Sequence, residues 1–501
     1  MFIESIYIDS FKNLKNFSLK FPTSEVVDVK GDVKLRLSIL IGENGTAKTT
    51  LFELITQAFI DSLESNYEIS YVINKEQFRK TNNNLYEKNV TLPNSIVIST
   101  YTPIDKLNIP EKVIKNSLVA IKKADLTSNN FRGIASRIFQ KYISDTSYDI
   151  HKILEYVGYG KKELYFEMSE HVLRGIINRA IENLLRKNTK ELIDYIQIYS
   201  IKHKVEEYSS QLENFRNTFV KKVDRNLSKL QEKRLRSDYN REYEKNIYDN
   251  LLLENIVIEL TYIQEKLLVI SRLAKHEFKS GRRRLINISD IDNIYPGGRW
   301  QLNKDLVFMS LFNINNLVTD IWIEQNFNRE LFPISTMSSG ELSLLIRFLD
   351  LYEYVEDNSI ILIDEPETHL HPKWIREYIE RIIDIIGEKR CHVIIATHSP
   401  LIVSDVTKEC IIAFKKEDNY ISQIDLKEKT LGMNYEELLS EVFGLEDYKG
   451  TMIDNYIKKV EQLLQDERID EALEIYNQIG DSAKKYNLFK KIKGYMDGKY
   501  V

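Results

Sequence analysis

The chain has few of the features that would tie it to an oxidising compartment or to a membrane. Its 501 residues include two cysteines, Cys391 and Cys410. Two cysteines cannot form a disulfide framework, so a reducing compartment is expected. No stretch approaches the roughly 18 apolar residues of a membrane-spanning helix, and the first residues lack the basic and apolar segments of a signal peptide. We therefore expect a cytoplasmic protein without a membrane partner.

The sequence also lacks a strong charge of either sign. The formal net charge is -5, so a nucleic-acid site would have to be a local basic patch. Prolines and glycines are few, at 9 and 18, while 43% of the residues are apolar and 29% are charged. This is the composition of a globular protein rather than a disordered one. The length predicts two or three domains.

Strand and helix patterns alternate near the start of the chain. Residues 2–10 alternate as a strand does, and 11–21 read as a turn followed by a second strand. Residues 35–41 form a continuous apolar run, which is typical of a strand buried on both faces. Residues 48–63 have helical spacing, and 95–100 are predicted to be the next buried strand.

The loop between residues 35–41 and the following helix is nearly a phosphate-binding loop. Its sequence is IGENGTAKTT (41–50), and it meets the pattern G-x-x-x-x-G-K-[ST] except that Ala47 replaces the last glycine. A loop between a strand and a helix points backbone N–H groups at phosphate oxygens and adds the positive end of the helix dipole. Lys48 would reach the β- and γ-phosphates, and the Thr49 hydroxyl would bind Mg²⁺. The predicted nucleotide-binding residues are Gly42, Asn44, Gly45, Ala47, Lys48, Thr49 and Thr50.

The substitution at Ala47 raises a question of backbone geometry. With helical dihedral angles the extra methyl group would be harmless. A positive φ would cost on the order of 1 kcal/mol or more.

Two later apolar runs end in polar side chains. The run SIILIDEPE (359–367) reaches Asp364 and Glu365. Asp364 would hold the Mg²⁺ shell, and Glu365 is placed to polarise an attacking water as a general base. The run CHVIIATHSP (391–400) places His398 near the position of a γ-phosphate. The alternative is a pair of buried strands that simply end in acids and in a structural histidine.

A serine-glycine turn precedes these strands. Ser338 and Ser339 come before Gly340 in MSSGE and open a helix with apolar periodicity. Serines at this position are ordinarily caps, but the same geometry also makes an anion site.

The segment from 105 to 330 has a different character, with rare glycines and long amphipathic stretches. Two helical runs, 205–230 and 251–270, predict an inserted helical domain with an antiparallel hairpin. Residues 410–426 read as a β-hairpin, and the tail after about 432 is predicted to be helical.

In order along the chain, the motifs GENGTAKTT, MSSGE, ILIDEPETHLHP and ATHSP resemble those of the ATP-binding-cassette ATPases of the SMC/RecF/OLD group. The resemblance implies an α/β fold: an ABC-type ATPase head with a mixed, mainly parallel sheet and flanking helices. The expected divisions are an N-terminal lobe of the head at 1–104, an inserted helical domain at 105–330, a C-terminal lobe at 331–430 and a helical tail at 431–501.

The resemblance also implies a mechanism. In that family two heads enclose two ATP molecules, and the signature turn of one subunit, here Ser338, Ser339 and Gly340, caps the γ-phosphate bound by the other. We therefore expect ATP and Mg²⁺ as ligands, ATP hydrolysis, and a homodimer or a higher oligomer.

Two departures from the family pattern predict slow hydrolysis. The first is Ala47. The second is the absence of a glutamine after residues 95–100, where the chain has Thr100, Tyr101 and Thr102. After His398 the chain lacks the acidic pattern of the Toprim nuclease of OLD proteins, so no nuclease site of its own is expected. His369 and His371 lie where the family has its D-loop. Two histidines this close could suggest a metal site, but the sequence shows no third metal ligand beside them.

Three functions are compatible with this head. The insertion is too long for a transporter cassette and too short for SMC arms. The chain resembles the PtuA-like ATPases of Septu-type anti-phage systems, which work beside an HNH nuclease, PtuB; ATP would then hold an assembly that restrains or positions this partner. The alternatives are a RecF-like, ATP-gated DNA clamp in repair and a nucleotide-binding scaffold with negligible turnover.

Basic clusters would serve the clamp, although charged runs are usually solvated faces. These clusters comprise Lys221, Lys222, Arg225, Lys229, Lys233, Arg234 and Arg236, and the run from Lys279 to Arg284.

Overall fold

The computed structural model of the chain describes most of the predicted head and parts of the insertion and tail. The described residues are 1–22, 25–27, 33–60, 62–82, 91–100, 119–123, 128–159, 163–186, 245–273, 276–278, 281–324, 330–418, 420–426, 429–444 and 452–496.

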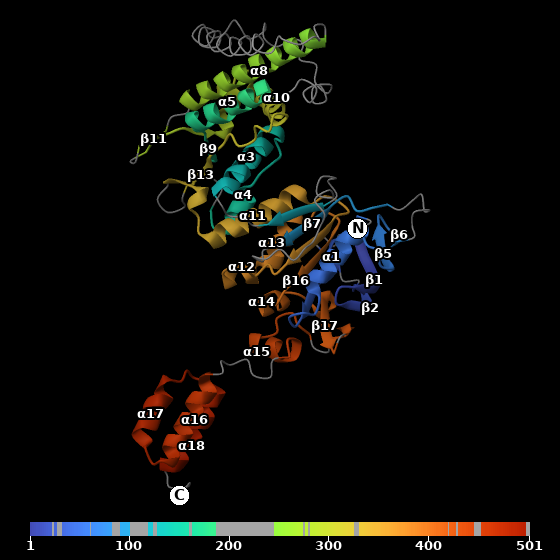
Figure 1. The fold of residues 1–501 in the computed structure, drawn as a ribbon. Coiled ribbons are helices and arrows are strands. Elements are labelled where there is room, and N and C mark those ends of the chain that lie inside the picture. The colour runs from blue at the N-terminus through green and yellow to red at the C-terminus, as the bar shows by residue number, and fades with distance from the viewer. Residues whose placement is uncertain are drawn as a thin grey trace.

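A mainly parallel, eight-stranded sheet forms the centre of the head (Figure 1). Its strand order is β18-β17-β4-β16-β15-β7-β8, and β3 pairs with β4 beside this path. The pairs from β17 to β8 are parallel, whereas β18 and β3 run antiparallel to their neighbours. The bounds are β3 Glu25–Val27, β4 Val33–Gly42, β7 Ile96–Thr100, β8 Val119–Lys123, β15 Ile360–Asp364, β16 Cys391–Ala396, β17 Ile411–Glu417 and β18 Tyr420–Ile424.

Helix α1 (Lys48–Phe59) packs between this sheet and a second, antiparallel one. The second sheet has the order β2-β1-β5-β6. Its strands are β1 Phe2–Phe11, β2 Leu14–Lys20, β5 Tyr67–Ile73 and β6 Glu76–Thr81. Alternate residues of the central strands face opposite sides: Ile360 and Leu362 pack with α1, whereas Ile361 and Ile363 pack into the core on the other side. Burial on both faces is why these strands have continuous apolar sequences.

The strands predicted in the head are confirmed. The runs 2–10 and 35–41 lie in β1 and β4, and 95–100 corresponds to β7. The predicted hairpin at 410–426 is the antiparallel pair β17–β18.

The face of the main sheet opposite α1 is covered by helices that also contact the insertion. Helices α11 (Ser339–Tyr354) and α13 (Tyr378–Ile386) contribute to the core on this side. The same core continues through buried side chains of the insertion, including Phe139, Leu154 and Leu260. Head and insertion therefore share one hydrophobic core within the described part of the chain.

The insertion combines helices with short strands, whereas the sequence predicts helices alone. Its helices are α3 Ser128–Ser144, α4 His151–Val157, α5 Glu170–Arg186, α8 Lys245–Leu273, α9 Ile291–Ile294 and α10 Gly298–Ser310. A four-stranded antiparallel sheet has the order β12-β9-β13-β14, and β10 and β11 form a separate hairpin. These strands are β9 Tyr165–Glu167, β10 His276–Phe278, β11 Gly281–Arg283, β12 Leu285–Asn287, β13 Asp320–Glu324 and β14 Leu331–Pro333. Runs this short show no readable alternation, so the helical periodicity dominates the sequence pattern.

Of the two long helices predicted in the insertion, the second, at 251–270, lies within α8. The first, at 205–230, falls outside the described residues.

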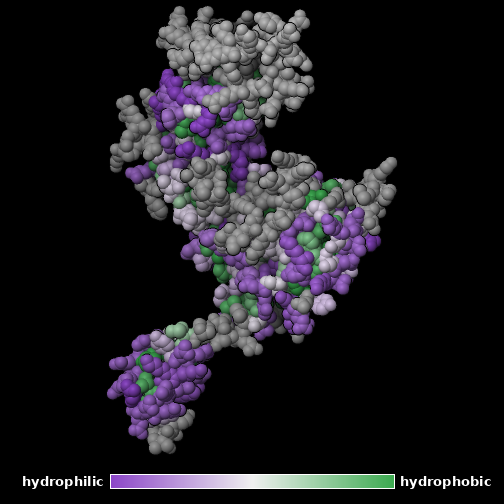
Figure 2. Space-filling view, in the orientation of Figure 1, coloured by the Kyte–Doolittle hydropathy of each residue, from purple (hydrophilic) through white to green (hydrophobic). Residues whose placement is uncertain are grey.

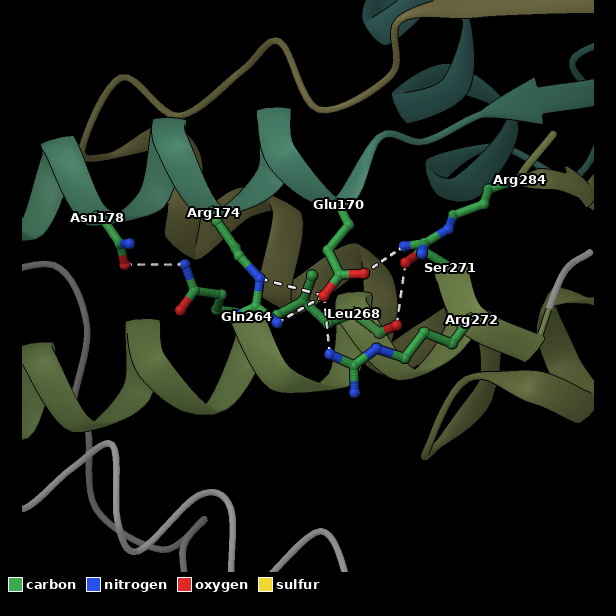
Figure 3. A network of polar contacts seen from close by, with 8 residues as sticks. All are labelled: Glu170, Arg174, Asn178, Gln264, Leu268, Ser271, Arg272 and Arg284. Atoms are coloured by element: carbon green, nitrogen blue, oxygen red, sulfur yellow. Dashed lines mark hydrogen bonds and ion pairs between the residues drawn. The ribbon is translucent and has the colours of Figure 1, made fainter. Parts of the chain in front are cut away.

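Three arginines hold two helices and a strand of the insertion together through one carboxylate (Figure 3). Glu170, at the start of α5, accepts hydrogen bonds from Arg174 on the same helix, Arg272 at the end of α8 and Arg284 next to β12. The closest N···O distances are 2.6, 2.8 and 2.5 Å, respectively. Hydrogen bonds from Arg272, Arg174 and Arg284 hold the pKa of Glu170 well below its usual range.

The tail contains a three-helix unit with its own core. Helices α16 (Met452–Gln465), α17 (Ile469–Gln478) and α18 (Ala483–Met496) bury Val460, Leu464 and Ile492 among themselves. Figure 1 draws the unit apart from the head, at the red end of the chain. A further short helix, α15 (Tyr435–Glu437), lies on the head side of this unit.

The coloured part of the surface in Figure 2 is mainly hydrophilic, with small apolar areas over the head and over the three-helix unit. Among the helices of the described residues, none combines the length and the apolar run that crossing a membrane requires.

We predict that Glu170→Gln lowers the free energy of unfolding of the chain at neutral pH by about 1 kcal/mol, because a neutral amide weakens three partly exposed ion pairs. The pKa of Glu170 is depressed in the folded state, so its contribution is complete above the unfolded pKa of about 4.3 and is lost as the pH falls below it. Denaturant unfolding at pH 7 and below pH 4 measures the difference. Glu182→Gln, at an exposed position of the same helix, is the matched control. An equal effect of both variants at pH 7 would contradict the ion-pair account.

Candidate nucleotide site

The register of four parallel strands brings the ends of β4, β16, β15 and β7 to one level. Asp364, the last residue of β15, aligns with Ala396 on one side and with Thr100 on the other, and Ala396 aligns with Leu40. The loops that follow β4, β15 and β16 therefore open at the same edge of the sheet. This edge holds the phosphate loop, the two strand acids and His398.

The phosphate loop requires a glycine at its first position. A Cβ atom on Gly42 would lie 2.8 Å from the backbone oxygen of Phe414 and 2.7 Å from Thr46 Oγ1. The Thr46 hydroxyl donates to the Glu43 carbonyl at 2.7 Å, which tightens the loop. Asn13, in the turn between β1 and β2, donates to the Gly45 carbonyl at 3.3 Å. The loop is thus held from both sheets.

Ala47 has a positive φ, the backbone geometry that is costly for a residue with a side chain. It is the N-cap of α1, with φ 65° and ψ 21°, a left-handed conformation. For a residue with a Cβ this conformation costs roughly 1–2 kcal/mol. Two terms offset the cost: alanine loses roughly 0.5–1 kcal/mol less backbone entropy than glycine on folding, and its nearly buried methyl contributes about 0.8 kcal/mol. The near balance explains how an alanine can stand in this loop.

We expect Ala47→Gly to change the free energy of unfolding by less than about 1 kcal/mol, because relief of strain and loss of the methyl nearly cancel. Ala47→Val should destabilise the chain by about 2 kcal/mol or more, since a β-branched side chain opposes a left-handed backbone. Chemical denaturation of both variants checks this. A well-tolerated valine would show that residue 47 does not have a positive φ.

The side chain of Lys48 is folded over its own loop. Its ammonium group donates to the Gly42 carbonyl at 2.7 Å and to the Glu43 carbonyl at 3.4 Å. Burial lowers the pKa of Lys48 to about 8, and this outweighs the opposing attraction of the nearby carboxylates. The charged form still predominates at neutral pH. Within the described residues, the hydrogen bonds of this buried cation go to carbonyl oxygens, so it is well suited to bind a phosphate group.

A hydrogen bond connects the phosphate loop to β15. Thr49 Oγ1 donates to Asp364 Oδ2 at 2.9 Å. Burial raises the pKa of Asp364 to about 6, and the charge of Glu365 adds to the rise. A hydroxyl and a carboxylate at this separation match the ligands by which Mg²⁺ is held beside nucleotide phosphates. The residues therefore fit a Mg²⁺ ion, which would relieve the cost of the buried carboxylate.

Glu365 and His398 lie beside this pair. Glu365 has a φ of 47°, an uncommon left-handed value, and its N–H donates to the Ala396 carbonyl at 2.8 Å. Strain of this kind is often found at functional sites. Burial lowers the pKa of His398, and the charge of Lys48 lowers it further. The imidazole is therefore neutral at physiological pH.

Sequence reasoning missed Glu367, which connects the two strand ends. Its carboxylate accepts hydrogen bonds from Thr397 Oγ1 at 2.9 Å and from the His398 N–H at 2.6 Å. Burial raises the pKa of Glu367. The third acid of IDEPE was the available signal, but spacing alone does not show which acid faces the neighbouring strand.

The serine-glycine turn forms the N-terminus of α11. Ser338 is the N-cap and makes a capping box with Glu341: the Glu341 N–H donates to Ser338 Oγ at 3.3 Å, and the Ser338 N–H donates to Glu341 Oε2 at 2.8 Å. Ser338 and Ser339 are exposed. At Gly340, a Cβ atom would come within 3.2 Å of the His369 carbonyl oxygen. The turn therefore packs on the loop that follows β15.

A buried arginine on the same helix, also missed, supports that loop. Arg347 is completely buried and donates to the carbonyl oxygens of Pro366 and Thr368. Its place within the apolar run of α11 was the signal, because an arginine on a buried helix face needs fixed acceptors.

The structure gathers five of the predicted site residues at one place. Lys48, Thr49, Asp364, Glu365 and His398 surround the edge of the sheet, as their hydrogen bonds and mutual effects on pKa show. Within the described residues, no hydrogen bond joins the turn at 338–340 to the phosphate loop.

The other sequence candidates have structural positions or lie outside the described residues. His371 caps the helix α12 (Pro372–Arg376) by accepting from the Lys373 N–H at 3.2 Å. Thr100 is buried at the end of β7. The candidates outside the described residues are Tyr101, Thr102, Lys279 and the cluster from Lys221 to Arg236.

A comparison with protein-family models gives a match that spans the whole site. The family described as "AAA domain, putative AbiEii toxin, Type IV TA system" matches residues 37–404, more than half of the chain. The chain belongs to this family. It therefore has an AAA-type ATPase domain, and its four motifs resemble those of the SMC/RecF/OLD group.

The relatives include a Septu protein, an endonuclease and a probable ATPase of a retron. The chain is 31% identical to the Septu protein PtuA of Bacillus thuringiensis over 124 residues, which is 24% of this chain and 31% of PtuA. It is 24% identical to the endonuclease GajA of Bacillus cereus over 440 residues, 80% of this chain and 58% of GajA. With the retron Vc95 probable ATPase of Vibrio cholerae it shares 22% identity over 458 residues, 86% of this chain and 77% of that one. The matches thus span less than two thirds of PtuA and of GajA.

Proposed function

We propose that the chain binds and slowly hydrolyses ATP, and that two copies enclose the nucleotide between them. The observation that carries the proposal is the hydrogen bond between Thr49 and Asp364, because it joins the phosphate loop to the strand acid where nucleotide-bound Mg²⁺ would be held. The ion would neutralise charge on the β- and γ-phosphate oxygens. Gly42, Asn44, Gly45, Ala47, Lys48, Thr49 and Thr50 would surround the phosphates.

Glu365 and His398 would carry out the hydrolysis of ATP. Glu365, one residue beyond the proposed Mg²⁺ ligand, would accept a proton from the attacking water. His398, neutral and tied to Glu367 through its backbone, would contact the γ-phosphate.

The proposal that two copies form a dimer rests on the turn at 338–340. Ser338 and Ser339 are exposed and have no hydrogen bond to their own phosphate loop among the described residues. The Ser338 N–H is taken by Glu341, so the N–H groups that follow it in the first turn of α11, together with the helix dipole, favour an anion. In a dimer the turn would cap the γ-phosphate bound by the other copy.

We further propose that this ATPase controls a nuclease partner in defence against phage. Its support is the likeness to PtuA, to GajA and to the retron ATPase. An HNH protein of the PtuB kind is the expected partner. Joint purification with such a protein from a neighbouring reading frame supports this role. Salt-dependent binding of duplex DNA by the chain alone would instead support a RecF-like clamp.

We predict that Glu365→Gln lowers turnover of ATP by about 100-fold or more, the scale of a lost general base. The variant should accumulate as an ATP-bound dimer, measured by light scattering after gel filtration with ATP and Mg²⁺. Glu388→Gln, at an exposed position of the head, is the control. Lys48→Ala should abolish ATP binding.

Two results would contradict the proposal. A nucleotide-binding scaffold would give the same low turnover before and after Glu365→Gln. A site that does not hold phosphates would keep full ATP affinity in Lys48→Ala.

A further inference from the structure

The first turn of α11 is connected to the insertion by a tyrosine. Tyr159 OH donates to Glu341 Oε1 at 3.1 Å. The other oxygen of the same carboxylate, Oε2, accepts the Ser338 N–H at 2.8 Å. One carboxylate therefore bridges a side chain of the insertion and the backbone of the serine-glycine turn.

Tyr159 is held in place by its own surroundings. Gly158 ends α4 in a left-handed conformation, with φ 108°, and the Tyr159 N–H donates to the Leu154 carbonyl at 2.8 Å. The ring of Tyr159 lies 5.1 Å from that of Phe332 in β14, centroid to centroid. Burial raises the pKa of Tyr159 to about 12, so its hydroxyl stays protonated as a donor.

Two other tyrosines near Tyr159 in the sequence bond to parts of the head away from the serine-glycine turn. Tyr148 OH donates to Glu353 Oε1 at 2.5 Å, near the C-terminus of α11. Tyr156 OH donates to Asp384 Oδ2 at 2.8 Å, on α13. These contacts fix the insertion to the head, whereas that of Tyr159 reaches the group that shapes the turn.

We propose that Tyr159 is a positioning residue through which the insertion sets the geometry of the serine-glycine turn, and so the turnover of ATP bound by the partner copy. The inference rests on the proposed function, because the turn acts on the other copy's nucleotide. Loss of the hydroxyl frees one oxygen of Glu341 and loosens the capping box. A shift of the insertion that separates Tyr159 from Glu341 has the same effect, so the insertion regulates hydrolysis.

Tyr159→Phe tests the role, because it removes the hydroxyl and keeps the ring against Phe332. We expect kcat to fall about tenfold, the scale of a hydrogen bond to a charged group, with an unchanged Kd for ATP on the isolated copy. Tyr156→Phe removes an equivalent tyrosine–carboxylate bond at a site remote from the turn and should keep the wild-type kcat. An equal loss in both variants, or a loss of ATP affinity in Tyr159→Phe, would overturn the proposal.

Hybrid dimers, isolated with two affinity tags, separate this inference from the dimer model. When Lys48→Ala and Tyr159→Phe are in one copy and the other is wild type, the remaining working site uses the altered turn, so turnover falls about tenfold below a Lys48→Ala/wild-type hybrid. When the two changes are in different copies, the working site uses an intact turn. Turnover should then equal that of the Lys48→Ala/wild-type hybrid.

If turnover instead falls when the two changes are in different copies, and not when they are in one copy, Tyr159 acts on its own copy's nucleotide. That result would overturn the shared site. Equal turnover in all three hybrids would overturn the role of Tyr159 alone.

Discussion

The register of the parallel strands is the constraint on which the site depends. Leu40, Ala396, Asp364 and Thr100 align across β4, β16, β15 and β7, so the loops that bear the chemistry start from one edge. A slip of one residue would send every side chain of a strand to the opposite face. Both faces are buried, one against α1 and the other against α11 and α13, so the apolar packing holds the register firmly. The hydrogen bond from Thr49 to Asp364 then fixes the phosphate loop to this edge.

Helix α11 is the second organising element, because three parts of the molecule meet on it. Its N-terminus carries the serine-glycine turn, and Gly340 packs against the loop after β15. Arg347 holds the carbonyl groups of the same loop, which leads from Glu365 to His369. The insertion contacts the helix through Arg137, which pairs with Asp350 at 2.9 Å. A change in the insertion therefore has a direct physical route to the acids of the nucleotide site.

The sequence was sufficient for the strands of the head, and it predicted several of the residues that the structure brings to one edge of the sheet. The continuous apolar runs that lead to Asp364 and His398 are short and rich in isoleucine and valine, which favours strands buried on both faces over helices. The spacing of the phosphate loop predicted which residues belong to it, but the positive φ of Ala47 is a property of the folded backbone. Glu367 and Arg347 act through carbonyl and N–H groups of other segments, so no local pattern marks them. The strands β9, β12 and β13 are short and distant in sequence, and only tertiary packing pairs them.

The claim that two copies share the nucleotide can be tested by cross-linking them. One copy carries Asn44→Cys and the other Ser338→Cys, both in the Glu365→Gln background; residues 44 and 338 are exposed, whereas the native Cys391 and Cys410 are buried. The account predicts covalent dimers, formed with a short bifunctional thiol reagent, only when ATP and Mg²⁺ are present. Absence of cross-linking with ATP, or equal cross-linking without it, would contradict a nucleotide held between the phosphate loop of one copy and the serine-glycine turn of the other.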